Sequence, residues 1–228
     1  MKIGFDLISD LNLSEDNFDW EGKVTSLFCI VAGNISNDLA IVEKTLSQLS
    51  DLYQRVFYID GALEHTNLDN YYDTIGIIQG ICDTLENVVY LHDNIAILND
   101  IAIVGCNGWN NCKQPESDED ALRLNAVAFQ DVVYLTRTIQ KLQVYNDVEK
   151  ILVVTSTVPS DDVCFGDMIT DMETPHPVLC LMNDTENKVK MWAFGSYENT
   201  VSNLLNDIQY VNNGCFNKKP YWAKRIEL

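Results

Sequence analysis

The chain has little positive charge. It carries 15 lysine and arginine residues against 34 aspartate and glutamate residues, a formal net charge of −19 at pH 7. A surface of that sign repels a phosphate backbone, which argues against direct nucleic-acid binding. The acidic residues are spread along the whole chain rather than gathered in a block, which is typical of a solvated acidic surface. A surface that attracts a basic protein partner is the more specific alternative.

Several features that mark common protein classes are also missing. No apolar run approaches the roughly 20 residues of a membrane helix, and the N-terminus lacks the basic head of a signal peptide. The seven cysteines include no C-x-x-C pair, which favours reduced buried thiols over a structural zinc site. The sequence also lacks a phosphate-binding glycine loop and a G-x-S-x-G nucleophile motif. We therefore expect a cytoplasmic protein that does not bind membranes.

Apolar runs typical of buried strands occur throughout the chain. They predict strands at residues 2–9, 24–32, 55–60, 87–91, 95–98, 101–104, 151–156, 188–194, 208–211 and 222–226. Amphipathic spacing predicts a helix that begins after Ser36 as its N-cap, and two more at about 68–85 and 118–145. The C-terminal segment 220–228 is expected either to close the second sheet or to make an assembly contact. Strands that first alternate with helices and then accumulate indicate one α/β domain over residues 1–228.

Five of the expected strands end in related motifs. They run Ser9-Asp10-Leu11-Asn12, Gly33-Asn34, Gly61-Ala62-Leu63-Glu64, Thr155-Ser156-Thr157-Val158-Pro159 and Gly195-Ser196-Tyr197-Glu198. In this order the chain resembles the calcineurin-like metallophosphoesterases, whose motifs are D-x-H, G-D, G-N-H-D/E, a histidine-containing turn and G-H-x-H. The resemblance covers almost the whole chain. It implies a four-layer αββα sandwich, in which two mixed sheets are flanked by helices.

The reaction of that family needs two divalent ions about 3.5–4 Å apart, which share a bridging hydroxide that attacks phosphorus. Carboxylates and neutral imidazoles hold the ions, because negative charge must offset the repulsion between the cations. Matched motif by motif, the resemblance implies that Asp10 is the single retained ligand. The other ligand and catalytic positions hold Asn12, Asn34, Ala62, Leu63, Ser156, Ser196 and Glu198.

The change at Asn34 has the largest consequence, because a neutral amide replaces the carboxylate that bridges the two ions. Ala62 and Leu63 can neither coordinate a metal nor transfer a proton. We therefore predict a site with no catalytic residue and no bound metal. If a single ion binds, its oxygen ligands would come from Asp10, Asn34 and Glu198, a set that suits Mg²⁺, Ca²⁺ or Mn²⁺.

These substitutions predict a pseudoenzyme, a phosphoesterase scaffold that serves as a binding or assembly module. A degraded pattern of this kind is compatible with a viral or phage protein, located in the host cytoplasm or the virion. A protein partner, basic in one version of the hypothesis, and a homo-oligomer are both expected. The alternatives are a phosphoesterase or nucleotide hydrolase with a remodelled one-metal or metal-free site, and a small-molecule binder without turnover. The three histidines, His65, His92 and His176, are expected at the surface or in loops.

Overall fold

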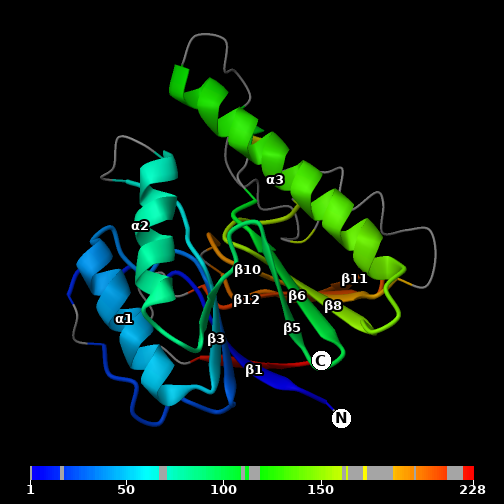
Figure 1. Cartoon of the computed structure of the whole chain (residues 1–228), viewed down its shortest axis with the longest axis horizontal. Helices are drawn as coiled ribbons and strands as arrows, with labels where there is room; N and C mark the ends of the chain where they lie inside the picture. The colour runs from blue at the N-terminus through cyan, green and yellow to red at the C-terminus, as the bar shows by residue number, and fades with distance from the viewer. Residues whose placement is uncertain are drawn as a thin grey trace.

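The computed structural model describes residues 2–15, 18–66, 71–108, 111–112, 119–160, 163, 172–173, 187–197, 199–214 and 223–228. Two sheets lie against each other, and helices cover their outer faces (Figure 1). This arrangement confirms the predicted α/β sandwich of two mixed sheets. Within the described residues, no helix is both long and apolar enough to cross a membrane.

The first sheet has five strands and is mostly parallel. Its order is β13 (Lys224–Glu227), β1 (Gly4–Ile8), β2 (Phe28–Ala32), β3 (Arg55–Ile59) and β4 (Val88–Tyr90). Neighbouring strands from β1 to β4 are parallel, and β13 pairs antiparallel with β1 at one edge. The C-terminal strand therefore joins the first sheet. The expectation that it closes the second sheet was wrong.

The second sheet has six strands. Its order is β11 (Ser202–Leu205), β12 (Ile208–Asn212), β10 (Val189–Phe194), β8 (Lys150–Thr155), β6 (Ile101–Cys106) and β5 (Asn94–Leu98). The four inner strands are parallel, and the two edge strands β5 and β11 are antiparallel to their neighbours. A separate two-stranded pairing joins β7 (Asn111–Cys112) to β9 (Met172–Glu173).

Three hydrophobic layers hold the sandwich together. Helices α1 (Leu39–Leu52) and α2 (Tyr71–Asp83) pack on the outer face of the first sheet, and α3 (Glu119–Gln143) packs on the outer face of the second. Between the sheets, residues such as Phe57 meet residues such as Leu152. The sequence of β6 is apolar throughout because its residues alternately face α3 and the other sheet, so both faces of the strand are buried.

Most of the predicted elements are present, with ends shifted by a few residues. The first helix is capped by Asp38 rather than Ser36, since the Asp38 carboxylate accepts a hydrogen bond from the Ala40 N–H. Ser36 instead accepts from the Asp38 N–H through its hydroxyl. Strand β11 was not predicted, because its exposed edge position gives it no continuous apolar run. The assignment of all 228 residues to one domain stays a prediction.

The two sheets approach each other closely where β10 ends. A Cβ atom at Gly195 would collide with the Ala32 carbonyl oxygen of β2 and would lie 3.0 Å from the Ser156 carbonyl oxygen. Gly33 has a positive φ of 77°, which residues with a side chain rarely adopt, and a Cβ atom there would lie 2.8 Å from the Ser156 Cβ. The two sheets can therefore meet at this edge only because glycine occupies both positions.

We predict that Gly195→Ala destabilises the fold by about 3 kcal/mol, because both atoms that the new methyl group meets belong to buried backbone. Urea unfolding measures the effect. The matched control is Gly76→Ala in α2, where a new Cβ would meet no atom within 4 Å. That exposed helical substitution should stabilise the protein by about 1 kcal/mol. Equal unfolding free energies for the two variants would contradict the close contact.

Candidate functional site

Polar residues gather where strands of both sheets end at the same edge of the sandwich. Asp10 follows β1, Asn34 follows β2 and Ser196 follows β10. Ligands of open α/β sheets bind outside the carboxyl ends of the strands, so this edge is the natural place for a site. All three residues have left-handed backbone, with φ of 55°, 59° and 55°, which is uncommon for residues other than glycine.

These three residues hydrogen-bond directly to one another. The Asn34 amide nitrogen donates to Asp10 Oδ1 at 2.8 Å and to the Ser196 hydroxyl at 2.9 Å. The Ser196 backbone N–H donates to both Asp10 oxygens, at 2.9 and 3.1 Å. Asp10 is fully buried, and burial raises the pKa of its carboxyl group to about 6 although these donors favour the ionised form. The network links β1 and β2 of one sheet to β10 of the other.

The orientation of the Asn34 amide follows from its partners. Its oxygen accepts a hydrogen bond from the Leu63 N–H at 3.0 Å, while its nitrogen faces the Asp10 carboxylate. The reversed amide would point NH₂ at an N–H donor and oxygen at a carboxylate, so two attractive contacts would become repulsive. The amide oxygen is thus turned away from Asp10. These residues do not fit a two-metal centre, because the Asn34 amide presents N–H donors where an acceptor that bridges two metal ions is needed.

Glu64 stabilises the same edge by accepting hydrogen bonds from the backbone that follows β2 and β3. Its carboxylate is fully buried and accepts backbone hydrogen bonds from Ile35, Gly61 and Asn34, at 2.6, 2.8 and 3.2 Å. Burial nevertheless raises the pKa of Glu64 to about 8. A Cβ atom at Gly61 would lie 2.5 Å from the Asn34 amide oxygen. The segment that begins at Gly61 can therefore pack against Asn34 only because position 61 has no side chain.

The remaining motif positions have separate environments. Asn12 is exposed, and its amide folds back to donate to the Asp10 carbonyl oxygen at 2.9 Å. Ala62 is also exposed, whereas Leu63 is half-buried. The buried Ser156 hydroxyl donates to the Asn107 carbonyl oxygen at 3.0 Å. Glu198 and His176 lie outside the described residues.

Comparison with known proteins agrees with the fold. PptH, the phosphopantetheinyl hydrolase of Mycobacterium tuberculosis, superposes with a TM-score of 0.73 over 99% of this chain and 96% of its own, at 13% sequence identity. PptH is a calcineurin-like phosphoesterase. The chain has a metallophosphoesterase-like fold.

Two further similarities extend this result. GAP50, the anchor in the inner membrane complex of Plasmodium, superposes with a TM-score of 0.52 over 100% of this chain and 77% of its own, at 15% identity. Protein L509 of Acanthamoeba polyphaga mimivirus is 23% identical over 233 residues, which cover 87% of this chain and 79% of that protein. No family model matches the sequence.

A second polar cluster of this metallophosphoesterase-like fold surrounds Asp60, which follows β3. The fully buried Asp60 carboxylate lies 2.5 Å from His65 Nε2 and accepts from the Tyr90 hydroxyl at 2.6 Å and the Asn107 amide at 3.0 Å. His92 Nδ1 lies 4.0 Å from the same carboxylate. Burial alone would raise the pKa of Asp60, but the hydrogen bond and charge of His65, helped by His92, hold it below its usual value.

His65 and His92 do lie in turns, yet their side chains are only 10% and 18% exposed. The expected loop position is therefore confirmed for these two residues, although their side chains are largely buried. One sequence signal could have found the cluster. Asp60, His92 and Asn107 each follow a buried strand by one or two residues, as the motif residues do.

A third group of side chains could in principle hold a metal ion. Single ligand atoms of Asp93, Cys106 and Asp131 all lie within 4.8 Å of one another. Cys106 and Asp131 are buried on the α3 side of the second sheet, and Asp131 accepts from the Gly108 N–H at 2.8 Å. That hydrogen bond explains Asp131 as an anchor for the loop after β6.

The raised pKa of Asp10 predicts a specific dependence of stability on pH. A folded-state pKa of about 6 against the ordinary 3.8 favours folding at low pH, and this contribution is lost as the pH rises through 6. The difference corresponds to about 3 kcal/mol. Asp10→Asn keeps an acceptor for Asn34 but cannot ionise. Urea unfolding between pH 4 and pH 7 should show the variant gaining about 2 kcal/mol relative to the wild type, because part of the effect is already lost at pH 4.

Asp51→Asn serves as the control, because Asp51 is an exposed aspartate on α1. Its unfolding free energy should follow the wild type across the same pH range. If the Asp10→Asn and wild-type curves ran parallel instead, burial would not control the charge of Asp10.

Proposed function

We propose that this protein is a pseudoenzyme of the metallophosphoesterase fold, which serves as a binding or assembly module without two-metal hydrolysis. The observation that carries the proposal is the Asn34 amide, whose nitrogen is held against Asp10 and Ser196 and whose oxygen is held by Leu63. Restoring a ligand there would break three hydrogen bonds of a buried network. The side chains at positions 62 and 63 supply no ligand atom and no proton.

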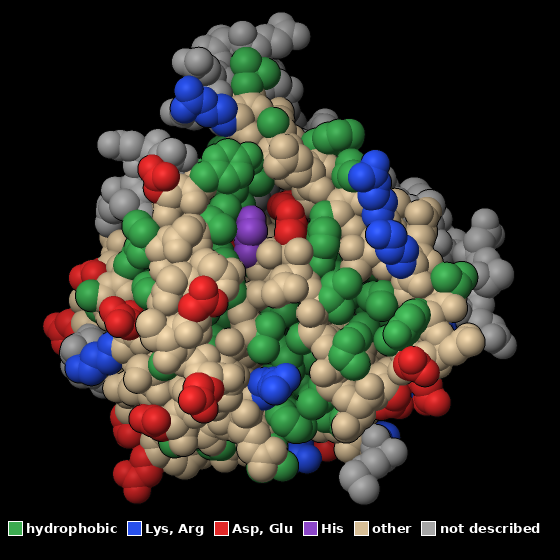
Figure 2. Space-filling model, in the orientation of Figure 1, with side chains coloured by type: hydrophobic (Ala, Val, Ile, Leu, Met, Phe, Trp, Pro, Cys, Tyr) green, Lys and Arg blue, Asp and Glu red, His purple; other side chains and the backbone are tan. Residues whose placement is uncertain are grey.

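Two similarities support an assembly role and a viral setting. GAP50 is named as an anchor, so the same fold serves elsewhere as an attachment point. The similarity to a mimivirus protein supports a viral source, with a location in host cytoplasm or virion. The narrower assignment to a phage stays a prediction. Acidic side chains are scattered over the face seen in Figure 2, in keeping with a basic protein partner; a homo-oligomer also belongs to the proposal.

Metal dependence is the direct test. With Mn²⁺ present, the wild type and Asp10→Asn should both release p-nitrophenol from bis(p-nitrophenyl) phosphate only at the rate of buffer, because the site offers no bridging carboxylate. Activity in the wild type that disappears in Asp10→Asn would overturn the proposal and establish a remodelled metal site that uses Asp10.

One observation favours the metal-free hydrolase as a second candidate. A buried carboxylate that orients an imidazole, as Asp60 does for His65, is a recurrent arrangement in general acid–base catalysis. His92 stands beside the same carboxylate. Hydrolysis without metal that survives in Asp10→Asn but disappears in His65→Ala would establish this candidate. Background rates in all three proteins would leave the pseudoenzyme as the better account.

A further inference from the structure

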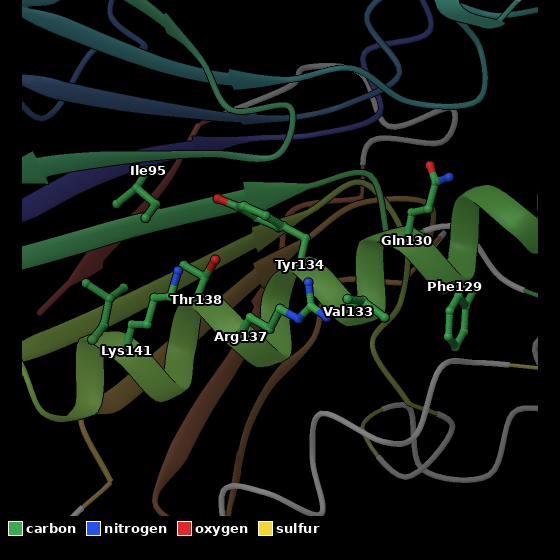
Figure 3. Close-up of a pocket in the computed structure, with 9 residues that line it drawn as sticks. Ile95, Phe129, Gln130, Val133, Tyr134, Arg137, Thr138 and Lys141 are labelled. Atoms are coloured by element: carbon green, nitrogen blue, oxygen red, sulfur yellow. The ribbon is translucent and has the colours of Figure 1, made fainter.

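A hollow separate from the strand-end site lies between α3 and the edge strand β5. Its volume is about 590 Å³, within the range of pockets that hold small organic ligands. Ile95 of β5 forms one wall, and Val133, Tyr134 and Leu142 of α3 contribute to the other. Figure 3 shows Tyr134 reaching from α3 toward β5, where Ile95 lies. Phe129, which is 68% exposed, also lines the hollow.

Two cations complete this hollow. Arg137 and Lys141 line it from the same helix, and their spacing of four residues places them next to each other on one side of α3. Among the described residues that line it, none carries a carboxylate. The charge of Asp93 helps to raise the pKa of the Tyr134 hydroxyl, but Asp93 is not among the lining residues.

The charge of α3 contrasts with that of the chain. Over residues 122–143, whose side chains the structure describes, the helix carries Arg123, Arg137 and Lys141 as exposed cations. The single carboxylate in that stretch, Asp131, is 2% exposed and faces the sheet. Figure 2 shows blue side chains beside hydrophobic ones over this part of the molecule. A basic and apolar surface is therefore built into a chain whose net charge is −19.

We infer that the hollow binds an amphipathic anion, a molecule with one extended apolar chain and one carboxylate or phosphate head. The apolar walls would cover the chain, and Arg137 and Lys141 would hold the head through charge-assisted hydrogen bonds. The net charge decides between ligand sizes. A polyanionic protein segment would be repelled by the rest of the surface in proportion to its own charge, whereas a single head group would be repelled little.

The inference goes beyond the proposed function and does not depend on it, since the hollow shares no residue with the strand-end network. Long basic side chains also cover apolar surface in proteins that bind nothing, so the experiment must separate the two cases. A binding measurement does so, because side chains that merely cover the surface would give no saturable binding.

Isothermal titration of the full chain with dodecanoate, kept below its micelle concentration, tests the inference. We expect saturable binding of one molecule per chain. The Arg137→Glu/Lys141→Glu variant should bind about tenfold more weakly or worse, because both head-group contacts become repulsive. Phe129→Ser should also weaken binding, and this exposed side chain can be changed without disturbing the core. Dodecanol and acetate, which lack the charge and the chain respectively, should each bind more weakly than dodecanoate.

The matched control is Lys44→Glu/Arg55→Glu, which changes the net charge equally at two exposed cations on α1 and β3. It should bind dodecanoate as the wild type does. Equal weakening in both double variants would overturn the inference, because only overall charge would matter. Absence of saturable dodecanoate binding would also overturn the inference. If a peptide of alternating leucine and glutamate bound instead, the hollow would be reassigned to a protein partner.

Discussion

The contact between the end of β10 and the end of β2 is the constraint on which the rest of this edge depends. Gly195 lies against the Ala32 carbonyl oxygen, with no room for a side chain. That approach brings the Ser196 N–H of one sheet within 2.9 Å of the Asp10 carboxylate of the other. The polar residues at the strand ends are thus held in place by backbone packing, since buried backbone has little freedom to shift.

The same contact explains how the strand-end site holds two buried acids. In a working two-metal centre, cations would compensate buried carboxylates. Here the amide of Asn34 and the N–H of Ser196 donate to Asp10, and three backbone N–H groups donate to Glu64. Each acid therefore has hydrogen-bond donors as partners, although burial still raises the pKa of both.

The two faces of the second sheet serve different purposes. Its inner face contributes to the core between the sheets, as Ile103 and Leu152 show. Its outer face packs on α3 through Leu135 and Ile139, but α3 leaves Ile95 at the edge strand partly exposed. An edge strand with an apolar side chain in the open is a liability unless something covers it. The basic side chains of Arg137 and Lys141 on α3 line the hollow next to that strand.

The sequence alone was sufficient for the layered architecture. The apolar runs that form β2, β3, β6 and β8 are buried on both faces. This pattern can be read without coordinates, because the helices pack on one face of each strand and the other sheet packs on the opposite face, and both layers require apolar residues. Strand β11 was missed because an exposed edge imposes no such demand. The order of the motifs likewise indicated the fold, which the superposition on PptH confirms.

The candidate site was only partly readable. The sequence determined which residue types stand at the strand ends, and hence that Asn34 is an amide and that positions 62 and 63 offer no ligand. Only the tertiary structure decided that the amide nitrogen faces Asp10, that His65 meets Asp60, and that Arg137 and Lys141 border a hollow. Each of these depends on contacts between segments whose relative positions are set by sheet pairing and packing, and local sequence carries no record of such distances.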